Sequence, residues 1–225
     1  MRKYRLILID TLLLCLVSTV LAIVVNFAVA KLKGEAKKDD PIVIAIIQAN
    51  TQEVEKLVQQ GAGVTNETDE LGRTALMRAA FVNFSGPRGG PGQEPAGILG
   101  DTDAKRSGLV GLLLSHGARL DARDRDGWTA LMWASWSGLT QVAGKLLESG
   151  ASPHFADRQG NTALLIAAQR GNTAIVTALL ANGADAAVAN KAGKSALAAA
   201  RTGLAQYPEQ AAGYAAVIAQ LTAVK

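Results

Sequence analysis

The stretch DRDGWTALMWASWSGLTQVAGKLLESGAS, residues 124–152, is repeated 33 residues later as DRQGNTALLIAAQRGNTAIVTALLANGAD, residues 157–185. The two segments align without a gap, and NKAGKSALAAARTG at residues 190–203 continues the same register. Self-similarity at a fixed period of this length is typical of proteins built from stacked repeats. These residues therefore decide the fold class.

Two further copies lie upstream. One begins DELGRTALMRAAFVN at residue 69 and resumes as SGLVGLLLSHGARLDARD at residue 107, and a degenerate copy reads DPIVIAIIQANTQEVEKLVQQGAG from residue 40. The sequence thus predicts a domain of five repeats over residues 40–225, with units at about 40–68, 69–123, 124–156, 157–189 and 190–225.

Each unit is expected to form a helix, a turn, a second helix and a finger-like loop. A hydroxyl residue precedes the first apolar run, where it would accept a hydrogen bond from a free amide of the helix; these N-caps are Thr74, Thr129, Thr162 and Ser195. A glycine follows the second apolar run, where a left-handed residue ends a helix; these are Gly117, Gly150 and Gly183. No unit can bury its apolar face alone, so the repeats must stack.

The motifs G-x-T-A-L, A-A and L-L-x-x-G-A at fixed offsets resemble the ankyrin repeat family, which implies an all-α solenoid that binds other proteins. The chain departs from the family's Thr-Pro-Leu-His tetrapeptide, because TALM, TALM, TALL and SALA stand in its place and no copy keeps the Pro or the His. Apolar packing is expected to replace the hydrogen bonds of that His, through Met77, Met132 and Leu165.

The second repeat carries an insertion. Gly72 and Gly127 are 55 residues apart, so 22 residues exceed the period, and the surplus falls in the Gly- and Pro-rich segment 83–105. That composition predicts a loop between the two helices of this repeat, on the edge opposite the finger loops. A loop of this length is either functional or disordered.

The N-terminus predicts membrane targeting. Residues 6–30 form an apolar segment after three basic residues, which fits either a transmembrane anchor or a signal peptide cleaved near Ala30, and residues 31–39 form a charged linker. An uncleaved segment would be an N-terminal hydrophobic helix in the lipid bilayer. The repeats would then lie in the periplasm, anchored to the inner membrane or free after cleavage. Cys15, the single Cys, would lie in the membrane or be removed.

Composition excludes several classes of function. One Cys and two His are too few for a disulfide framework or for most zinc sites. Of the net charge of +4, residues 1–40 hold +3, so the repeats lack the basic stripe that nucleic-acid binding needs. His116 and His154 have no partners for a catalytic triad. We therefore expect no catalytic residue, no cofactor, no metal and no small-molecule substrate.

All three Trp of the chain lie within nine residues, WTALMWASW at 128–136. Trp133 is expected to fill the core, whereas Trp128 and Trp136 occupy positions that face the concave, partner-binding surface of ankyrin proteins. Exposed Trp is enriched in binding hot spots. The predicted partner-binding residues are Trp128, Trp136, Arg125, Arg158, Asn161, Gln169 and Arg170. The alternative is that Trp128 and Trp136 pack near Phe81 or cover the insertion.

The expected function is a non-enzymatic module that presents this surface to an unidentified protein partner on the exported side of a membrane. An immunity protein that occludes a toxin or enzyme is one alternative, and an accessory protein for a stress-response partner is another. An enzyme that uses the insertion is disfavoured, because the segment offers acids such as Glu94, Asp101 and Asp103 but no His or Cys.

Overall fold

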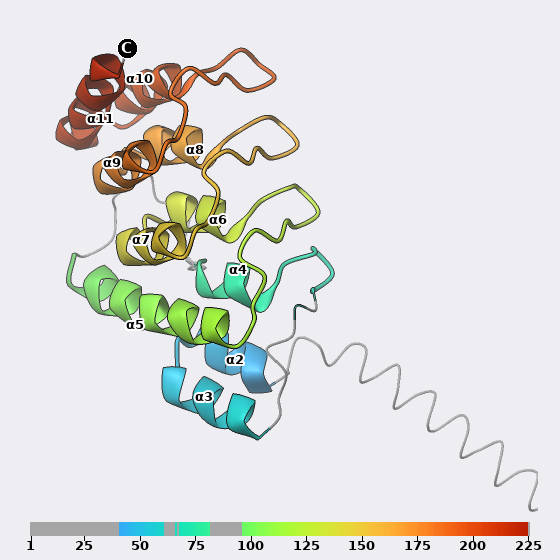
Figure 1. The fold of residues 1–225 in the computed structure, drawn as a ribbon. Helices are drawn as coiled ribbons and strands as arrows, with labels where there is room; N and C mark the ends of the chain where they lie inside the picture. Colours follow the sequence, from blue (N-terminus) through green and yellow to red (C-terminus); the bar gives the residue numbers. More distant parts are fainter. Residues whose placement is uncertain (1–40, 61–65, 67, 82–95, 225) are drawn as a thin grey trace, which may run out of the picture.

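Helix pairs stacked in one direction make up the fold, as a computed structural model shows for residues 41–60, 66, 68–81 and 96–224 (Figure 1). The first helices of the pairs are α2 (Pro41–Ile47), α4 (Ala75–Ala79), α6 (Ala130–Ser137), α8 (Ala163–Gln169) and α10 (Ala196–Gln206). The second helices are α3 (Thr51–Gln59), α5 (Ala96–Ser115), α7 (Thr140–Glu148), α9 (Thr173–Ala181) and α11 (Ala211–Ala223), the last preceded by the short 3-10 helix η2 (Pro208–Gln210). Each set contacts its own neighbours, which gives two helical layers.

The predicted caps are confirmed. The hydroxyl oxygens of Thr74, Thr129, Thr162 and Ser195 each accept a hydrogen bond from the backbone N–H three residues later. Gly117, Gly150 and Gly183 have φ values of 84°, 90° and 83°, so they supply the left-handed residue that ends each second helix. Apart from isolated bridges in the finger loops, the residues described hold no strand.

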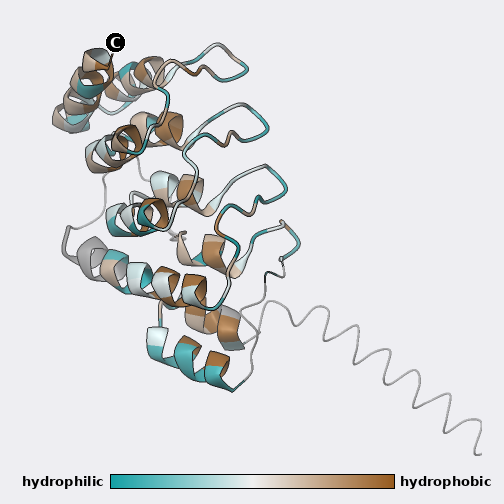
Figure 2. Ribbon diagram, in the orientation of Figure 1, coloured by the Kyte–Doolittle hydropathy of each residue, from teal (hydrophilic) through white to brown (hydrophobic). Residues whose placement is uncertain are grey.

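The core lies between the two layers and is built from small and aliphatic side chains. Met77, Met132 and Leu165 are at most 2% exposed, so apolar packing does fill the positions of the missing family His. Figure 2 shows hydrophobic residues facing one another between the layers and hydrophilic residues along the finger loops. In the part of the chain that the structure describes, no helix is both long and apolar enough to cross a membrane. The predicted hydrophobic segment 6–30 lies outside it.

The insertion differs from its prediction, because its second half is helical rather than a loop. Helices α7 and α9 begin at Thr140 and Thr173, which places the matching start of α5 at Ser107, yet α5 begins at Ala96. Its extra turns extend away from the finger loops, on the predicted edge (Figure 1). The prediction of a loop to Lys105 was therefore wrong from Ala96 onward, while residues 83–95 lie outside the described chain.

Two buried side chains anchor the last of these extra turns. The carboxylate of Asp103 accepts hydrogen bonds from the backbone N–H groups of Gln141 (2.8 Å) and Val142 (3.1 Å), in the first turn of α7. Leu139 has no side-chain oxygen to cap that turn itself. Three residues after Asp103, the guanidinium of Arg106 donates to the carbonyls of Arg78 and Ala79 at the end of α4. The extension thus ties α5 to the helices on both sides.

The C-terminal helix α11 closes the stack through Tyr214, which is fully buried. Its hydroxyl donates to the carbonyl oxygen of Gln169 at 3.0 Å, and its ring lies against Gly171 and Gly203. A Cβ on Gly203 would collide with the Tyr214 ring, whereas a Cβ on Gly108 in α5 would have no atom within 4 Å.

Substitution of these two helical glycines should therefore have opposite effects. Gly108→Ala should raise the free energy of unfolding by about 0.5–1 kcal/mol, because alanine favours a helix more than glycine does. Gly203→Ala should lower it by about 1–3 kcal/mol, because Tyr214 must move. Urea denaturation followed by circular dichroism measures both, and a stabilised Gly203→Ala variant would contradict the packing of α11.

Candidate functional site

The finger loops are shaped by one side chain in the turn of each loop. The Oδ1 atoms of Asp69, Asp124, Asp157 and Asn190 each accept hydrogen bonds from the backbone N–H groups two and four residues later, at 2.8–3.0 Å. A short Asp or Asn side chain suits this turn because it reaches its own backbone two residues on.

Consecutive fingers are also joined to one another. The backbone N–H groups of Arg125, Arg158 and Lys191 donate to the carbonyls of Leu71, Asp126 and Gln159 in the preceding finger, each at 2.9 Å. The residues that follow the loop Asp or Asn are thus held one per repeat along one edge of the molecule.

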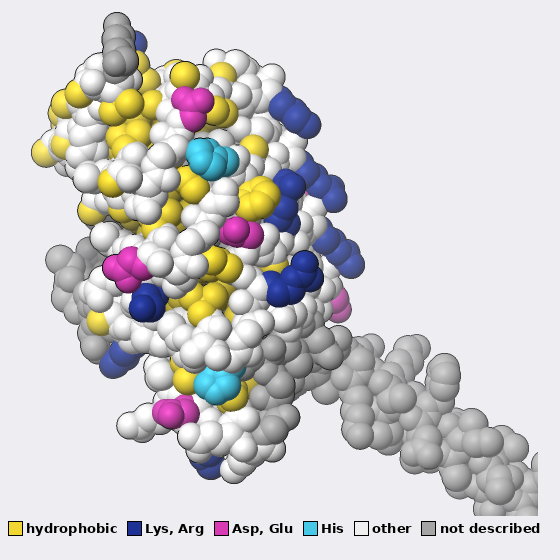
Figure 3. Space-filling view, viewed as in Figure 1, with side chains coloured by type: hydrophobic (Ala, Val, Ile, Leu, Met, Phe, Trp, Pro, Cys, Tyr) yellow, Lys and Arg dark blue, Asp and Glu magenta, His cyan; other side chains and the backbone are white. Residues whose placement is uncertain are grey.

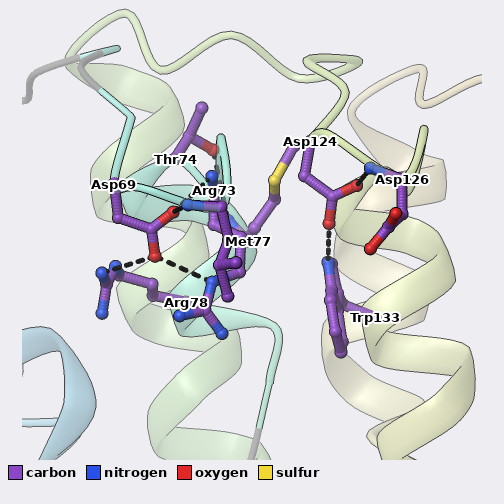
Figure 4. Close-up of polar contacts among 9 residues, drawn as sticks. Asp69, Arg73, Thr74, Met77, Arg78, Asp124, Asp126 and Trp133 are labelled. Carbon is purple, nitrogen blue, oxygen red and sulfur yellow. Dashed lines mark hydrogen bonds and ion pairs between the residues drawn. The ribbon is translucent and has the colours of Figure 1, made fainter.

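The second oxygen of the loop Asp reaches the first helix in two of the repeats (Figure 4). In the third repeat, Oδ2 of Asp124 accepts a hydrogen bond at 3.1 Å from the indole Nε1 of Trp133 on α6. In the second repeat, Oδ2 of Asp69 pairs with Nε of Arg73 (2.8 Å) and with Nη2 of Arg78 on α4 (2.7 Å). The same register position therefore orients a Trp in one unit and an Arg in the other.

The charge pair in the second repeat changes the pKa of Asp69. Burial is the largest single effect and acts to raise this pKa, but the hydrogen bonds from Arg73 and the charges of Arg73 and Arg78 together lower it below the ordinary 3.8. Asp69 therefore stabilises the fold when it is ionised.

Four rings form a continuous row, here called the aromatic shelf: Phe81, Trp133, Trp128 and Trp136. Phe81 meets Trp133 edge-on with centroids 4.7 Å apart, Trp133 lies 4.6 Å from Trp128, and Trp128 meets Trp136 at 6.0 Å. These distances are typical of favourable aromatic pairs. The shelf runs from the end of α4 across the finger base of the third repeat to α6.

Trp136 ends the shelf and is the exposed ring, with 38% of its surface accessible. The guanidinium of Arg170, just after α8, lies 4.5 Å from its ring centroid, within the range of a cation–π contact. Burial lowers the pKa of Arg170, while Tyr207 and Tyr214 act to raise it. No carboxylate of the described residues forms an ion pair with Arg170.

The predicted binding residues lie in the fingers and first helices of the third and fourth repeats, where Trp128, Trp136 and Arg170 contact one another. Arg125, Arg158 and Gln169 are exposed there. Asn161 lies at the same place, but its amide is occupied: Nδ2 donates to Asp157 (2.9 Å) and Oδ1 accepts from Asn190 (2.8 Å). The Asn161 side chain thus joins two fingers, and we expect its neighbours rather than Asn161 to contact a partner.

The prediction for Trp133 needs correction. The residue is half-buried at the edge of the core rather than inside it, and it is the shelf member that contacts Phe81. The sequence did not reveal its hydrogen bond with Asp124, although an Asp nine residues before a Trp or Arg in two repeats was a visible signal. Nor did it reveal that Asp103 and Arg106 are buried and committed to neighbouring helices.

Among the residues that the structure describes, neither histidine is paired with both a nucleophile and a carboxylate. Ser115 Oγ lies 3.2 Å from His116 Nδ1, a proximity that the sequence analysis did not anticipate, but both groups also contact the carbonyl of Leu112. No carboxylate in the described ranges hydrogen-bonds to His116, and His154 is exposed in its finger loop. The same ranges contain no group of three or more His, Cys, Asp or Glu residues that could hold a metal ion.

A solenoid of helix pairs with ordered finger loops and a continuous exposed surface defines a repeat scaffold for binding. Comparison with known families agrees: residues 143–207 match the family described as "Ankyrin repeats (3 copies)", and residues 126–158 match a single "Ankyrin repeat". Residues 126–207 are therefore similar to ankyrin repeats, and such repeats indicate a protein–protein interaction module. A comparison with curated proteins finds no match.

The charge of Asp69 should be visible in the pH dependence of stability. Because its pKa is lowered in the folded state, its contribution is present above pH 3.8 and is lost as the pH falls through the folded-state value. Asp69→Asn should lower the free energy of unfolding by about 1.5–3 kcal/mol at pH 7 and by much less at pH 2.5, as measured by urea denaturation.

Glu148→Gln is the matched control for this measurement, since Glu148 is exposed and its ion pair with Lys145 spans 4.0 Å. It should change stability by no more than about 0.5 kcal/mol at either pH. An Asp69→Asn effect of equal size at pH 7 and pH 2.5 would show that the ion pairs are not its cause.

Proposed function

We propose that this chain is a non-catalytic binding protein that captures a protein partner on the surface around Trp136. The contact surface comprises the aromatic shelf, Arg170 and Gln169 beside it, and the finger residues Arg125 and Arg158. Binding would change the activity or the stability of the partner. The chain itself would need neither a cofactor nor a catalytic group for this.

The observation that carries this proposal is the arrangement of Trp136. Its ring meets Trp128 edge-on and lies under the guanidinium of Arg170, and it is still 38% exposed. A large aromatic ring held rigidly at a surface loses little conformational entropy when a partner covers it. Trp and Arg are also the residue types most enriched in binding hot spots.

Removal of the Trp128 and Trp136 rings should strongly weaken capture. In a pull-down with the full-length chain, Trp128→Ala/Trp136→Ala should weaken binding of the native partner by about 30-fold or more, the effect of one hot spot of ~2 kcal/mol. Circular dichroism checks that the variant is folded. Val188→Ala is the matched control, because Val188 is an exposed apolar residue of equal exposure (38%) in another finger loop.

Unchanged capture by the folded double variant would refute the proposed surface. The captured partner also separates the two roles open to such a protein. An immunity or inhibitor protein would suppress the partner's activity in an enzyme assay, whereas an accessory protein would preserve that activity under oxidative or thermal stress.

We further infer that residues 6–30 deliver the repeats to the exported side of a membrane. The uncharged run from Thr11 to Ala30 is about as long as a membrane-spanning helix requires, and Ala28-Val29-Ala30 resembles a cleavage site. Cys15 is the single Cys of the chain and precedes the repeats, so an oxidising compartment would not form disulfides in the repeats.

The intact mass of the native protein tests this inference. A full-length mass, with extraction from membranes only by detergent, is expected for an anchor. Loss of about the first 30 residues, with release of the repeats in the periplasmic fraction, is expected for a signal peptide. A full-length chain recovered in the cytosolic fraction without detergent would contradict both.

A further inference from the structure

The finger tips carry a row of cations. Arg125, Arg158 and Lys191 each follow the loop Asp or Asn of their repeat, and all three are exposed. Their backbone N–H groups are fixed by the bonds between fingers, so their side chains project from equivalent places in successive repeats. Figure 3 shows Lys and Arg gathered along the edge where Figure 1 places the finger loops.

The carboxylates behind this row are already engaged. Asp124 accepts hydrogen bonds from Asp126, Trp128 and Trp133, and Asp157 accepts them from Gln159 and Asn161. The side chain of Asp126 is the one acid exposed at the tips of the third to fifth fingers. The cations at the tips therefore outnumber the exposed acids beside them.

Arg170 adds a cation next to the aromatic shelf. It is only half-exposed, and its contact with Trp136 satisfies the face of the guanidinium but none of its N–H donors. A carboxylate that approached Trp136 would find these donors over the face of the ring, where partial burial strengthens a charge-assisted hydrogen bond.

We propose that this surface, the docking surface of the proposed function on which the inference rests, recognises an acidic segment of a protein in which Glu or Asp alternates with large apolar side chains. An apolar side chain of the segment covers Trp136 and a neighbouring carboxylate pairs with Arg170. Further carboxylates pair with Arg125, Arg158 and Lys191 along the finger tips.

A protein segment fits these observations better than a nucleic acid. The row offers one cation in each of the third to fifth repeats, with Asp126 among them and Glu70 at the same position of the second repeat, whereas nucleic-acid surfaces present a dense basic patch to closely spaced phosphates. Phosphates also cannot cover the apolar rings of the aromatic shelf, whereas an apolar side chain of a protein segment can.

Three synthetic peptides test the chemistry, each labelled for fluorescence anisotropy and added to the full-length chain in non-ionic detergent. They are (Glu-Glu-Phe)4, its basic counterpart (Lys-Lys-Phe)4 and its non-aromatic counterpart (Glu-Glu-Ser)4. At about 50 mM salt, where exposed charges are weakly screened, (Glu-Glu-Phe)4 should bind, (Glu-Glu-Ser)4 should bind at least tenfold more weakly and (Lys-Lys-Phe)4 should not bind.

Variants then locate the binding. Arg125→Gln/Arg158→Gln/Lys191→Gln should weaken (Glu-Glu-Phe)4 binding about tenfold and reduce its salt dependence, since each exposed pair contributes modestly. The control Lys56→Gln/Lys145→Gln removes lysines of α3 and α7, away from the fingers, and should leave binding unchanged. Arg170→Gln should weaken binding, whereas Arg170→Lys, which keeps the charge, should retain most of it.

Preferred binding of (Lys-Lys-Phe)4, or no effect of the finger-tip variant, would overturn the proposal. Tighter binding of a dT20 oligonucleotide through the same arginines would overturn it in favour of a nucleic acid. The proposed function fails by a different result, which is unchanged partner capture by Trp128→Ala/Trp136→Ala. If that variant loses its partner while (Glu-Glu-Phe)4 does not bind, the docking surface stands and its acidic specificity is wrong.

Discussion

The rest of the binding surface depends on the hydrogen bonds that the Asp or Asn side chain in each finger turn accepts from the backbone. By accepting two backbone N–H groups, Asp69, Asp124, Asp157 and Asn190 close the turn that places a left-handed glycine at the tip. Only when this turn is closed can the backbone N–H of the following residue, such as Arg125, reach a carbonyl of the preceding finger. The local turn therefore comes first, and the alignment of successive repeats follows from it.

The second oxygen of the same side chain contacts a different partner in the second and third repeats. Where it meets Arg78 it forms a charge pair, and where it meets Trp133 it fixes the plane of an indole against which Trp128 packs. The orientation of the exposed Trp136 thus depends on a chain of contacts that begins at Asp124. Asp124 therefore both closes a finger turn and orients the rings of the candidate site.

Much of this fold could be predicted from the sequence, because its signals are local. N-caps, C-terminal glycines and the 33-residue period each depend on residues close in the chain, and the structure confirms them. The start of α5 could not be predicted in this way. The Gly and Pro content of the insertion predicted a loop, whereas the end of its helical part is anchored by contacts of Asp103 and Arg106 with residues about 27–39 positions away. Of the predicted site residues, Trp128, Trp136 and Arg170 lie together, whereas the amide of Asn161 is occupied by a partner in the next repeat.

The restriction of all three Trp to the third repeat has a spectroscopic consequence. Intrinsic indole emission from this protein reports on the centre of the solenoid alone, whereas circular dichroism reports on every helix. In a repeat array, contacts are limited to neighbours and the ends can separate from the middle without full unfolding. The two signals together would distinguish fraying of the terminal repeats from loss of the central one, without any added label.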